Sequence, residues 1–391
     1  MSISDMHTRL LVLITLSLQS LLVMSAHAER FELENPSDSL VGDLRYVQVR
    51  DDETLVDIAR EFDLGYDQIV KANPGVNRWI PGEGTKVIIP HQYILPSAPR
   101  KGLILNIPEL RLYFYPTPRK GAPQQILTYP VSIGRMDWRT PLGATKVITK
   151  ERNPPWRPPP SIRAEHARDG DPLPEVIPGG DPTNPLGKFA LRLGIPTYLI
   201  HGVDERKAFG IGMRVTHGCI RMYPEDIESL FDLVSVNTPV VLVDEPIKIG
   251  RLGDRIFLSV HQPLEEGEDD AAPPAPRVSV EQTIRLLRTS LGSSVSLNDE
   301  QIASITEQGN GIPHEISLAA PIEPRPSRPT MTSSGMPRTV SEEYEEALSR
   351  YLTPAATPLP RSERAIERRG VPTTGDEDDD DAVRQYLEER Y

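Results

Sequence analysis

Short apolar or alternating segments, separated by Gly, Pro, Asn and Asp, recur between residues 100 and 262. They include "GLILNI", "RLYFYP", "QILTYPVSIG", "TKVITK", "TYLIHG", "PVVLVD" and "RIFLSVH". Short runs of this kind, bounded by turn residues, are typical of strands. Proline, of which the chain has 40, is disfavoured inside helices because it lacks an N–H donor and clashes with the preceding turn. The pattern predicts a mainly β domain over residues 100–245 and a strand extension over 246–262.

One segment inside this region has the spacing of a helix. "YPEDIESLFDLV" places Pro224 near the first turn and acidic residues beside the N-terminus, and both features favour a helix start. Apolar residues recur three or four positions apart, at Ile227, Leu230, Phe231 and Val234. Because that spacing gives a helix one apolar face, we expect this helix to pack against the sheet, directly after the chain's single cysteine.

Residues 44–91 have the pattern of a small α+β unit. "RYVQV" predicts an opening strand, and Thr54 can cap a helix whose apolar residues are Leu55, Ile58, Ala59 and Phe62. A second short helix is expected to end at "NPG", residues 73–75, and "TKVIIP" predicts a closing strand. The expected order is strand, helix, helix, strand.

The first 28 residues have the features of a secretory signal peptide. An apolar run from Leu10 to Met24 follows Arg9, and "AHA" at 26–28 supplies a small-residue cleavage site. The run is about 15 residues long, shorter than the roughly 20 that a membrane helix needs, although an uncleaved anchor stays an alternative. We expect an exported protein without a stable membrane span.

The composition changes after residue 262. "LEEGEDDAAPPAPRVS" reads as a linker, residues 309–340 are rich in Pro, Ser and Thr, and "GDEDDDD" is an acidic run. "VEQTIRLLRTSL" at 280–291 predicts one amphipathic helix, and two further short helices are expected nearer the C-terminus. Such a composition buries little apolar surface, so residues 263–391 are predicted to form a mostly disordered tail.

The composition also disfavours several classes of function. A formal net charge of −13 disfavours a nucleic-acid partner, because nucleic acids are polyanions. One cysteine cannot build a structural zinc site, and no His, Cys and Asp residues have metal-ligand spacing. We therefore expect neither a metal nor a cofactor.

That single cysteine is Cys219, in "VTHGCIRMYP". It could be a small buried apolar residue, which is what most free cysteines are. An exported protein that keeps an unpaired thiol exposes it to oxidation, which favours a functional thiol. A nucleophilic thiol needs a base and donors for an oxyanion nearby.

Either of two histidines could be the general base, and spacing alone does not choose between them. His217 lies two residues before Cys219, so on a strand both side chains point to the same side. His201 ends a predicted strand and could meet the cysteine across a sheet. Gly218 lets the backbone approach a substrate, so the N–H groups of Gly218 and Cys219 are natural oxyanion donors. Arg221, two residues after the thiol, could bind a carboxylate or lower the thiol pKa.

The arrangement of His201 followed, after 14 residues, by "THGC" and "IRM" resembles the catalytic domain of the L,D-transpeptidase (YkuD) family. "LNIPELRLYFYP", "PVSIGRMDWRTPLG", "NPPWRPPPSI" and "NPLGKFALRLG" also read like this family, so the resemblance covers roughly residues 100–262. It implies a β-sandwich with Cys219 as nucleophile and His201 as proton acceptor and donor. The carbonyl of Gly202 is the implied third element, and His217 would shape the pocket.

The same resemblance implies a substrate site. Arg221, Gly202, Thr216 and Tyr198 are expected to contact the substrate. Val203 stands where the family more often has Thr, within a charged segment that could alter the choice of acceptor.

Residues 44–91 resemble a LysM domain, whose members bind the glycan of peptidoglycan or chitin. With the family resemblance, this predicts a periplasmic L,D-transpeptidase of the cell wall that acts in cell-shape maintenance. It would form an acyl-enzyme from a peptidoglycan tetrapeptide stem, release D-alanine, and pass the acyl group to a diaminopimelate amine or to a lysine of an outer-membrane lipoprotein. Two alternatives stay open. One is a hydrolase of stem or lipoprotein links with the same site, and the other is a non-catalytic wall-binding protein.

Overall fold

The computed structural model describes residues 29–134, 140–168, 170–262, 277–292 and 297–317, together with the backbone of a short strand at 325–326. The predicted signal peptide, and the predicted tail apart from these segments, lie outside the described residues. None of the helices in the described ranges has the length and hydropathy that crossing a membrane requires.

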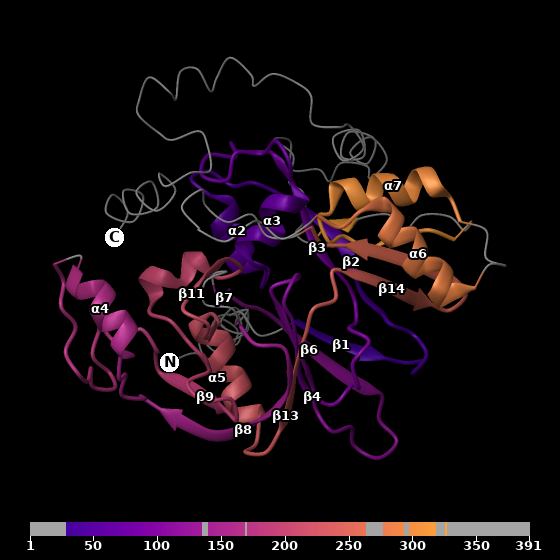
Figure 1. Ribbon diagram of the computed structural model, residues 1–391. Helices are drawn as coiled ribbons and strands as arrows, with labels where there is room; N and C mark the ends of the chain where they lie inside the picture. The colour runs from indigo at the N-terminus through magenta and orange to yellow at the C-terminus, as the bar shows by residue number, and fades with distance from the viewer. Residues whose placement is uncertain are drawn as a thin grey trace, which may run out of the picture.

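One curled sheet of nine strands forms the centre of the molecule (Figure 1). In spatial order its strands are β1 (Glu29–Leu33), β6 (Gln124–Pro130), β5 (Arg111–Tyr115), β4 (Gly102–Asn106), β13 (Pro239–Val243), β8 (Gly143–Arg152), β9 (Phe189–Leu193), β10 (Leu199–His201) and β12 (Ile220–Arg221). A two-stranded sheet of β11 (Arg214–Thr216) and β7 (Ile133–Gly134) lies beside it. The prediction of a mainly β domain is confirmed, but a single curled sheet with a small companion takes the place of the expected sandwich.

The main core lies on one face of this sheet, under helix α5 (Pro224–Leu233). Ile227, Leu230 and Phe231 are buried along the helix, as its spacing predicts, and Val234 is buried at its end. Phe231 meets Phe189 of β9 with ring centroids 5.0 Å apart. This helix therefore fixes the core face of β9, which pairs with β10, the neighbour of the strand that follows the cysteine.

The segment predicted as strand, helix, helix, strand has that order. It consists of β2 (Leu40–Gln48), α2 (Leu55–Glu61), α3 (Tyr66–Ala72) and β3 (Lys86–Ile94), with β2 and β3 antiparallel. Thr54 caps α2 as expected, because its hydroxyl accepts from the Asp57 N–H while the Asp57 carboxylate accepts from the Thr54 N–H. Both strands are longer than predicted, and β17 (Arg325–Pro326) pairs in parallel with β2.

This β-α-α-β unit is docked against the central sheet and the segments beside it. The Tyr66 N–H, at the start of α3, donates to the Ile211 carbonyl at 2.8 Å. Gly65 and Gly212 approach so closely that a side chain at either position would collide with the backbone of the other. Fully buried Arg111 on β5 donates to the Asp63 carbonyl at 2.9 Å. The unit therefore lies against the segment that leads into β11 and the cysteine.

The C-terminal region corrects the predicted tail boundary. Strands β14 (Ile247–Leu252), β15 (Arg255–Val260) and β16 (His314–Glu315) form an antiparallel sheet, covered by α6 (Val280–Leu291) and α7 (Asp299–Gln308). The helix expected at 280–291 is present, but the prediction of disorder is wrong for residues 277–292 and 297–317. The physical reason is a shared core: Ile302 and Ile305 of α7 and Leu287 of α6 bury apolar surface against Leu258 and Val260.

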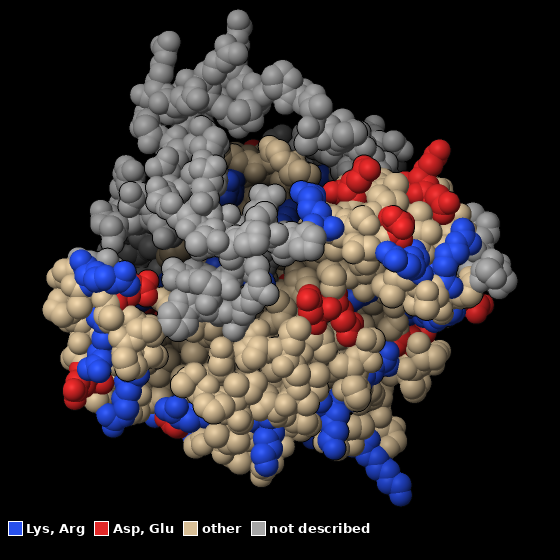
Figure 2. All heavy atoms as spheres, viewed as in Figure 1, with Lys and Arg blue, Asp and Glu red and all other residues tan. Residues whose placement is uncertain are grey.

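Charged side chains are interspersed on the face seen in Figure 2, mainly around the α4 segment and the α6–α7 unit. Helix α4 (Pro160–Arg168) belongs to a long excursion between β8 and β9 and lies at the left of Figure 1.

Candidate active site

Cys219 follows a tight turn between β11 and β12. Gly218 has φ of +98°, a left-handed conformation that residues with side chains rarely adopt. The Thr216 hydroxyl donates to the Cys219 carbonyl at 2.6 Å and accepts from the Gly218 N–H at 3.1 Å. Thr140 donates to the Gly218 carbonyl at 3.0 Å. Two buried hydroxyls therefore hold the backbone that presents the thiol.

The sheet register brings His201 to the same face as the thiol. β10 and β12 pair in parallel, with Ile200 opposite Ile220 and His201 opposite Arg221. Because side chains alternate along a strand, His201, Cys219 and Arg221 point to one side. The two isoleucines point to the other side, where both belong to the main core.

His201 is 3% exposed, and its Nδ1 lies 2.6 Å from the Gly202 carbonyl. A carbonyl only accepts, so Nδ1 carries the proton and Nε2 of the neutral ring is left as a base. Burial and the nearby Arg221 charge lower the pKa of His201 to about 3, against the opposing effect of the Gly202 and Leu186 carbonyls. The imidazole is therefore neutral at pH 7.

The thiol is neutral at rest as well. Burial raises the pKa of Cys219 above its ordinary value, although a hydrogen bond with the Leu199 backbone and the charges of Arg221 and Arg192 act in the opposite direction. Sγ lies 3.7 Å from the Thr197 carbonyl, which can accept its proton in a weak hydrogen bond. A neutral thiol beside a neutral imidazole suits general-base activation at the moment of attack rather than a standing thiolate.

Arg221 is half-buried, and burial lowers its pKa, opposed by Cys219 and Asp204. Its backbone exchanges two hydrogen bonds of 3.0 Å with Ser132, which fixes β12. Among the described residues, its Nε has no hydrogen-bond partner. Its charge acts on Cys219, Asp204 and His201.

His217 lies on the solvent side of the turn. Its Nε2 is 3.2 Å from the Glu165 carboxylate of α4, and its side chain is 25% exposed. The contact links the excursion between β8 and β9 to the cysteine turn. That His217 shapes the pocket stays a prediction.

Other predicted site residues are placed differently. Thr216 is fully buried and its hydroxyl is used inside the turn, so its side chain shapes the turn and does not face a substrate. Tyr198 packs against the main core. Gly218, an expected oxyanion donor, gives its N–H to Thr216.

Sequence reasoning missed Thr197, Arg192 and Glu165. Thr197 has φ of +72° in the turn "GIPT" between β9 and β10, and that turn composition was the signal that could have marked it. Arg192 and Glu165 had no local signal, because sheet register and the α4 excursion bring them to the site.

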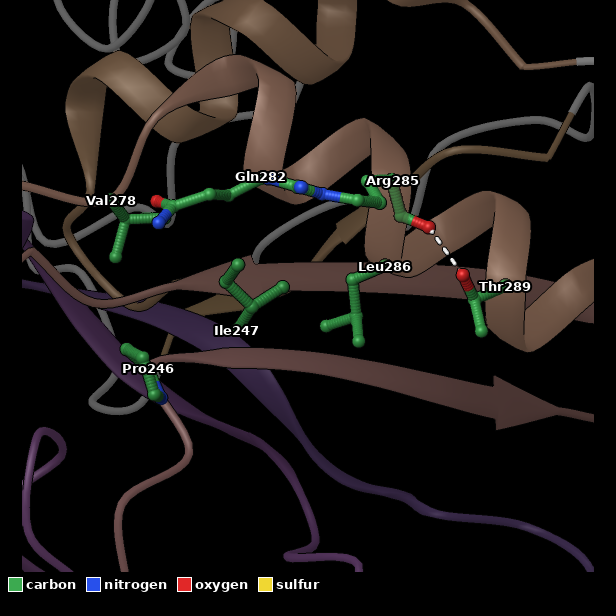
Figure 3. A pocket seen from close by; sticks show the side chains of 7 residues that line it. All are labelled: Pro246, Ile247, Val278, Gln282, Arg285, Leu286 and Thr289. Carbon is green, nitrogen blue, oxygen red and sulfur yellow. Dashed lines mark hydrogen bonds between the residues drawn. The ribbon is translucent and has the colours of Figure 1, made fainter.

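A separate pocket of about 450 Å³ lies between β14 and α6, away from the thiol (Figure 3). Its lining residues are Pro246, Ile247, Val278, Gln282, Arg285, Leu286 and Thr289. The Gln282 side chain accepts from the Ser279 N–H in the helix cap, and Thr289 donates to the Arg285 carbonyl at 2.9 Å. Within the described ranges, no group of three or more His, Cys, Asp or Glu residues could hold a metal ion.

Comparisons with known proteins place the chain in a family. Residues 100–242 match the model of the L,D-transpeptidase catalytic domain, YkuD. The Escherichia coli (strain K12) protein named "Probable L,D-transpeptidase YcfS" is 39% identical over 277 residues, which span 69% of this chain and 84% of that protein. The chain belongs to the L,D-transpeptidase family.

Two further relatives from the same organism agree with this assignment. "Probable L,D-transpeptidase YbiS" is 39% identical over 62% of this chain and 78% of its own length, and "Probable L,D-transpeptidase ErfK/SrfK" is 36% identical over 74% and 91%. Among solved structures, the catalytic domain of the Enterococcus faecium L,D-transpeptidase is 19% identical over 38% of this chain and all of that one, with a TM-score of 0.28. The protein is an L,D-transpeptidase enzyme on the strength of the sequence matches.

Proposed function

We propose that this L,D-transpeptidase works by cysteine acyl transfer, with Cys219 as nucleophile and His201 as proton acceptor and donor. One observation carries the proposal. Nδ1 of His201 lies 2.6 Å from the Gly202 carbonyl, and the ring shares a sheet face with the thiol. That arrangement leaves Nε2 unprotonated on the side where a base is needed.

In the first half-reaction, the donor is the tetrapeptide stem of peptidoglycan. Sγ of Cys219 forms a bond to the carbonyl carbon of the third residue while its proton passes to Nε2 of His201. The bond from that carbon to the D-alanine nitrogen then breaks, and Nε2 returns the proton to the leaving amine. A thioester remains. The backbone N–H of Cys219 would stabilise the oxyanion, and one such donor contributes roughly 3 kcal/mol in other acyl-transfer enzymes.

In the second half-reaction, an acceptor amine forms a bond to the carbonyl carbon of the thioester while His201 takes its proton. The bond from that carbon to Sγ then breaks, and His201 returns the proton to Sγ, which restores the thiol. We propose a diaminopimelate amine, giving a 3-3 crosslink, or a lysine of an outer-membrane lipoprotein as acceptor. Water as acceptor would make the enzyme a hydrolase.

We propose a periplasmic location for this chemistry, reached through the signal peptide at 1–28. The β-α-α-β unit would bind glycan strands as a LysM domain. Its docking through Tyr66 and Gly212 onto the segment before β11 supports this assignment, because a bound glycan would raise the local concentration of stems at the thiol.

The test is the intact mass of the purified chain after incubation with tetrapeptide muropeptides, beside Cys219→Ala. An acyl adduct or 3-3 dimer with the wild type, absent with the variant, is the expected result. Tripeptide product without dimer would favour the hydrolase, unless added lipoprotein captures the acyl group. Equal inertness of both proteins, with retained binding to sacculi, would overturn the catalytic proposal in favour of a wall-binding protein.

A further inference from the structure

A second arginine shares the sheet face of the thiol. Arg192 on β9 lies opposite Leu199 on β10, and Leu199 lies beside Cys219, to which its backbone is hydrogen-bonded. Directly opposite residues on paired strands point to the same side. Arg192, Leu199 and Cys219 therefore form one row across the sheet, and the row formed by Ala190, His201 and Arg221 runs next to it.

The two arginines near the thiol differ in what they can reach. Arg221 lies within the protein, and its charge acts on Cys219 and Asp204. The Arg192 side chain is 39% exposed, and its charge also acts on Cys219. Of the two arginines whose charges act on the thiol, Arg192 is thus the one with the more exposed side chain, which a substrate can reach.

Arg192 already holds a carboxylate in this structure. Glu151 on β8 contacts it through two atom pairs, Nε with Oε1 and Nη2 with Oε2, the second at 3.2 Å. Such a two-point fork is the geometry with which a guanidinium recognises carboxylates. Because the pair is partly exposed, exchange of Glu151 for another carboxylate costs little.

We propose that Arg192 binds a carboxylate of the donor stem peptide while the reacting carbonyl lies at Cys219, and that Glu151 holds the guanidinium in place until the donor arrives. This inference rests on the proposed function. Two strand spacings of about 4.8 Å separate the backbones of β9 and β12. That span of about 10 Å equals about three residues of extended peptide, and the Arg192 side chain extends over part of it. Two carboxylates of the donor lie within that distance of the reacting carbonyl: the terminal one of the leaving D-alanine and the far one of the diaminopimelate.

The experiment measures acylation rates against donor concentration for three synthetic tetrapeptide donors. One is the free acid, one carries a carboxamide on the terminal D-alanine, and one carries a carboxamide on the far carboxyl group of the diaminopimelate. The proteins are the wild type, Arg192→Gln, Arg192→Lys and Arg152→Gln. Arg152 is the matched control, because it lies on the same strand pair but on the opposite face, where it contacts Asp232 at 2.9 Å.

We expect Arg192→Gln to raise KM for the free acid by about 10- to 100-fold, the range of a charged hydrogen bond, with a smaller change in kcat. Arg192→Lys should recover part of the loss. One of the two carboxamide donors should show the same loss with the wild type and no further loss with Arg192→Gln, which identifies the carboxylate. Arg152→Gln should match the wild type.

An unchanged KM in Arg192→Gln would overturn the inference. So would a loss that persists equally for all three donors, since Arg192 would then act on the thiol and not on a carboxylate. The rate of Cys219 alkylation by iodoacetamide, measured on the same proteins, reports that second case directly. A wild-type chain that forms no adduct with any donor would instead contradict the proposed function, and this inference with it.

Discussion

The buried ionisable groups around Lys248 and those around Cys219 are compensated in opposite ways. Lys248 on β14 is 2% exposed, and its Nζ lies 2.7 Å from the Glu109 carboxylate, which is 6% exposed. Tyr113 donates to the same carboxylate, and the Ile94 carbonyl accepts from Nζ. This cluster joins the C-terminal unit, the central sheet and β3. At the thiol, His201 faces a carbonyl and the positive charge of Arg221 instead.

The protonation states follow from these surroundings. Burial is the largest single influence on Glu109 and raises its pKa, but the charges of Lys248 and His261 and the hydrogen bonds from Lys248 and Tyr113 together outweigh it, so the pKa is lowered. Burial also lowers the pKa of Lys248, against the opposing effect of Glu109. Burial and Arg221 together lower the pKa of His201, and burial raises the pKa of Cys219. The Lys248–Glu109 cluster therefore holds a buried ion pair that stabilises the contact between parts of the fold. The candidate active site instead holds neutral groups that can exchange a proton.

His201→Gln should have the largest effect on catalysis. Glutamine keeps a neutral polar side chain but cannot take a proton from the thiol, so the acylation rate should fall by about 10²- to 10⁴-fold. The free energy of unfolding should fall by about 1 kcal/mol, because one buried polar side chain replaces another. Intact-mass time courses and urea unfolding measure the two quantities. An acylation rate within threefold of the wild type would rule out His201 as the base.

Lys248→Met should instead lower stability strongly and leave the acylation rate almost unchanged. It leaves Glu109 buried without its cation, and breaking such a pair destabilises a protein by about 3–5 kcal/mol. Urea unfolding measures this loss, and the double variant Lys248→Met/Glu109→Gln should recover part of it. The acylation rate per folded molecule should stay near the wild-type value. A urea unfolding midpoint of Lys248→Met equal to that of the wild type would show that stability does not depend on the Lys248–Glu109 pair.

The pH dependence of stability sharpens the contrast. The folded-state pKa of His201 is about 3, below the unfolded value of about 6.5. The unfolded chain therefore binds the extra proton first. Stability from the neutral ring is complete above about pH 6.5 and is lost as the pH falls toward 3.

His201→Gln should accordingly flatten the slope of unfolding free energy in that window by up to about 1.4 kcal/mol per pH unit. Urea unfolding at half-unit pH steps checks this. Parallel slopes for the two proteins would mean that His201 does not titrate differently on folding.

Arg60→Gln should have the smallest effect. Arg60 on α2 contacts Glu225 at 2.9 Å and Glu205 at 2.7 Å, but its side chain is 36% exposed. Exposed ion pairs contribute about 1 kcal/mol or less. Thermal unfolding should show a small shift that disappears at high salt. A loss of stability comparable to that of Lys248→Met would show that this exposed ion-pair cluster stabilises the fold as much as the buried Lys248–Glu109 pair does.

Local signals in the sequence predict much of the fold. The Thr54 cap, the apolar spacing of α5 and the amphipathic α6 are each read within one or two helical turns. Helix α4 was missed because "PPPSIRAEHAR" begins with prolines, although proline is compatible with a first helical turn. The C-terminal unit was missed because α7 and β16 gain their burial from β15, across a linker whose composition resembles disorder.

Some residues of the candidate site could likewise be predicted from local sequence, and others could not. Cys219, Gly218 and Arg221 stand together in sequence, so their association was predictable. Spacing could not choose between His201 and His217, because the choice depends on the parallel pairing of β10 with β12. Arg192 was missed since only the register of β9 brings it to the thiol.

The neutral resting thiol is tested most directly by the pH dependence of its alkylation. The chain has one cysteine, so intact mass after iodoacetamide treatment reports Cys219 alone. We expect the alkylation rate to keep rising with pH through a midpoint above that of a free cysteine, because burial raises the pKa of this thiol. A rate that is already maximal near pH 6 would reveal a standing thiolate paired with a protonated His201, and would contradict the general-base account.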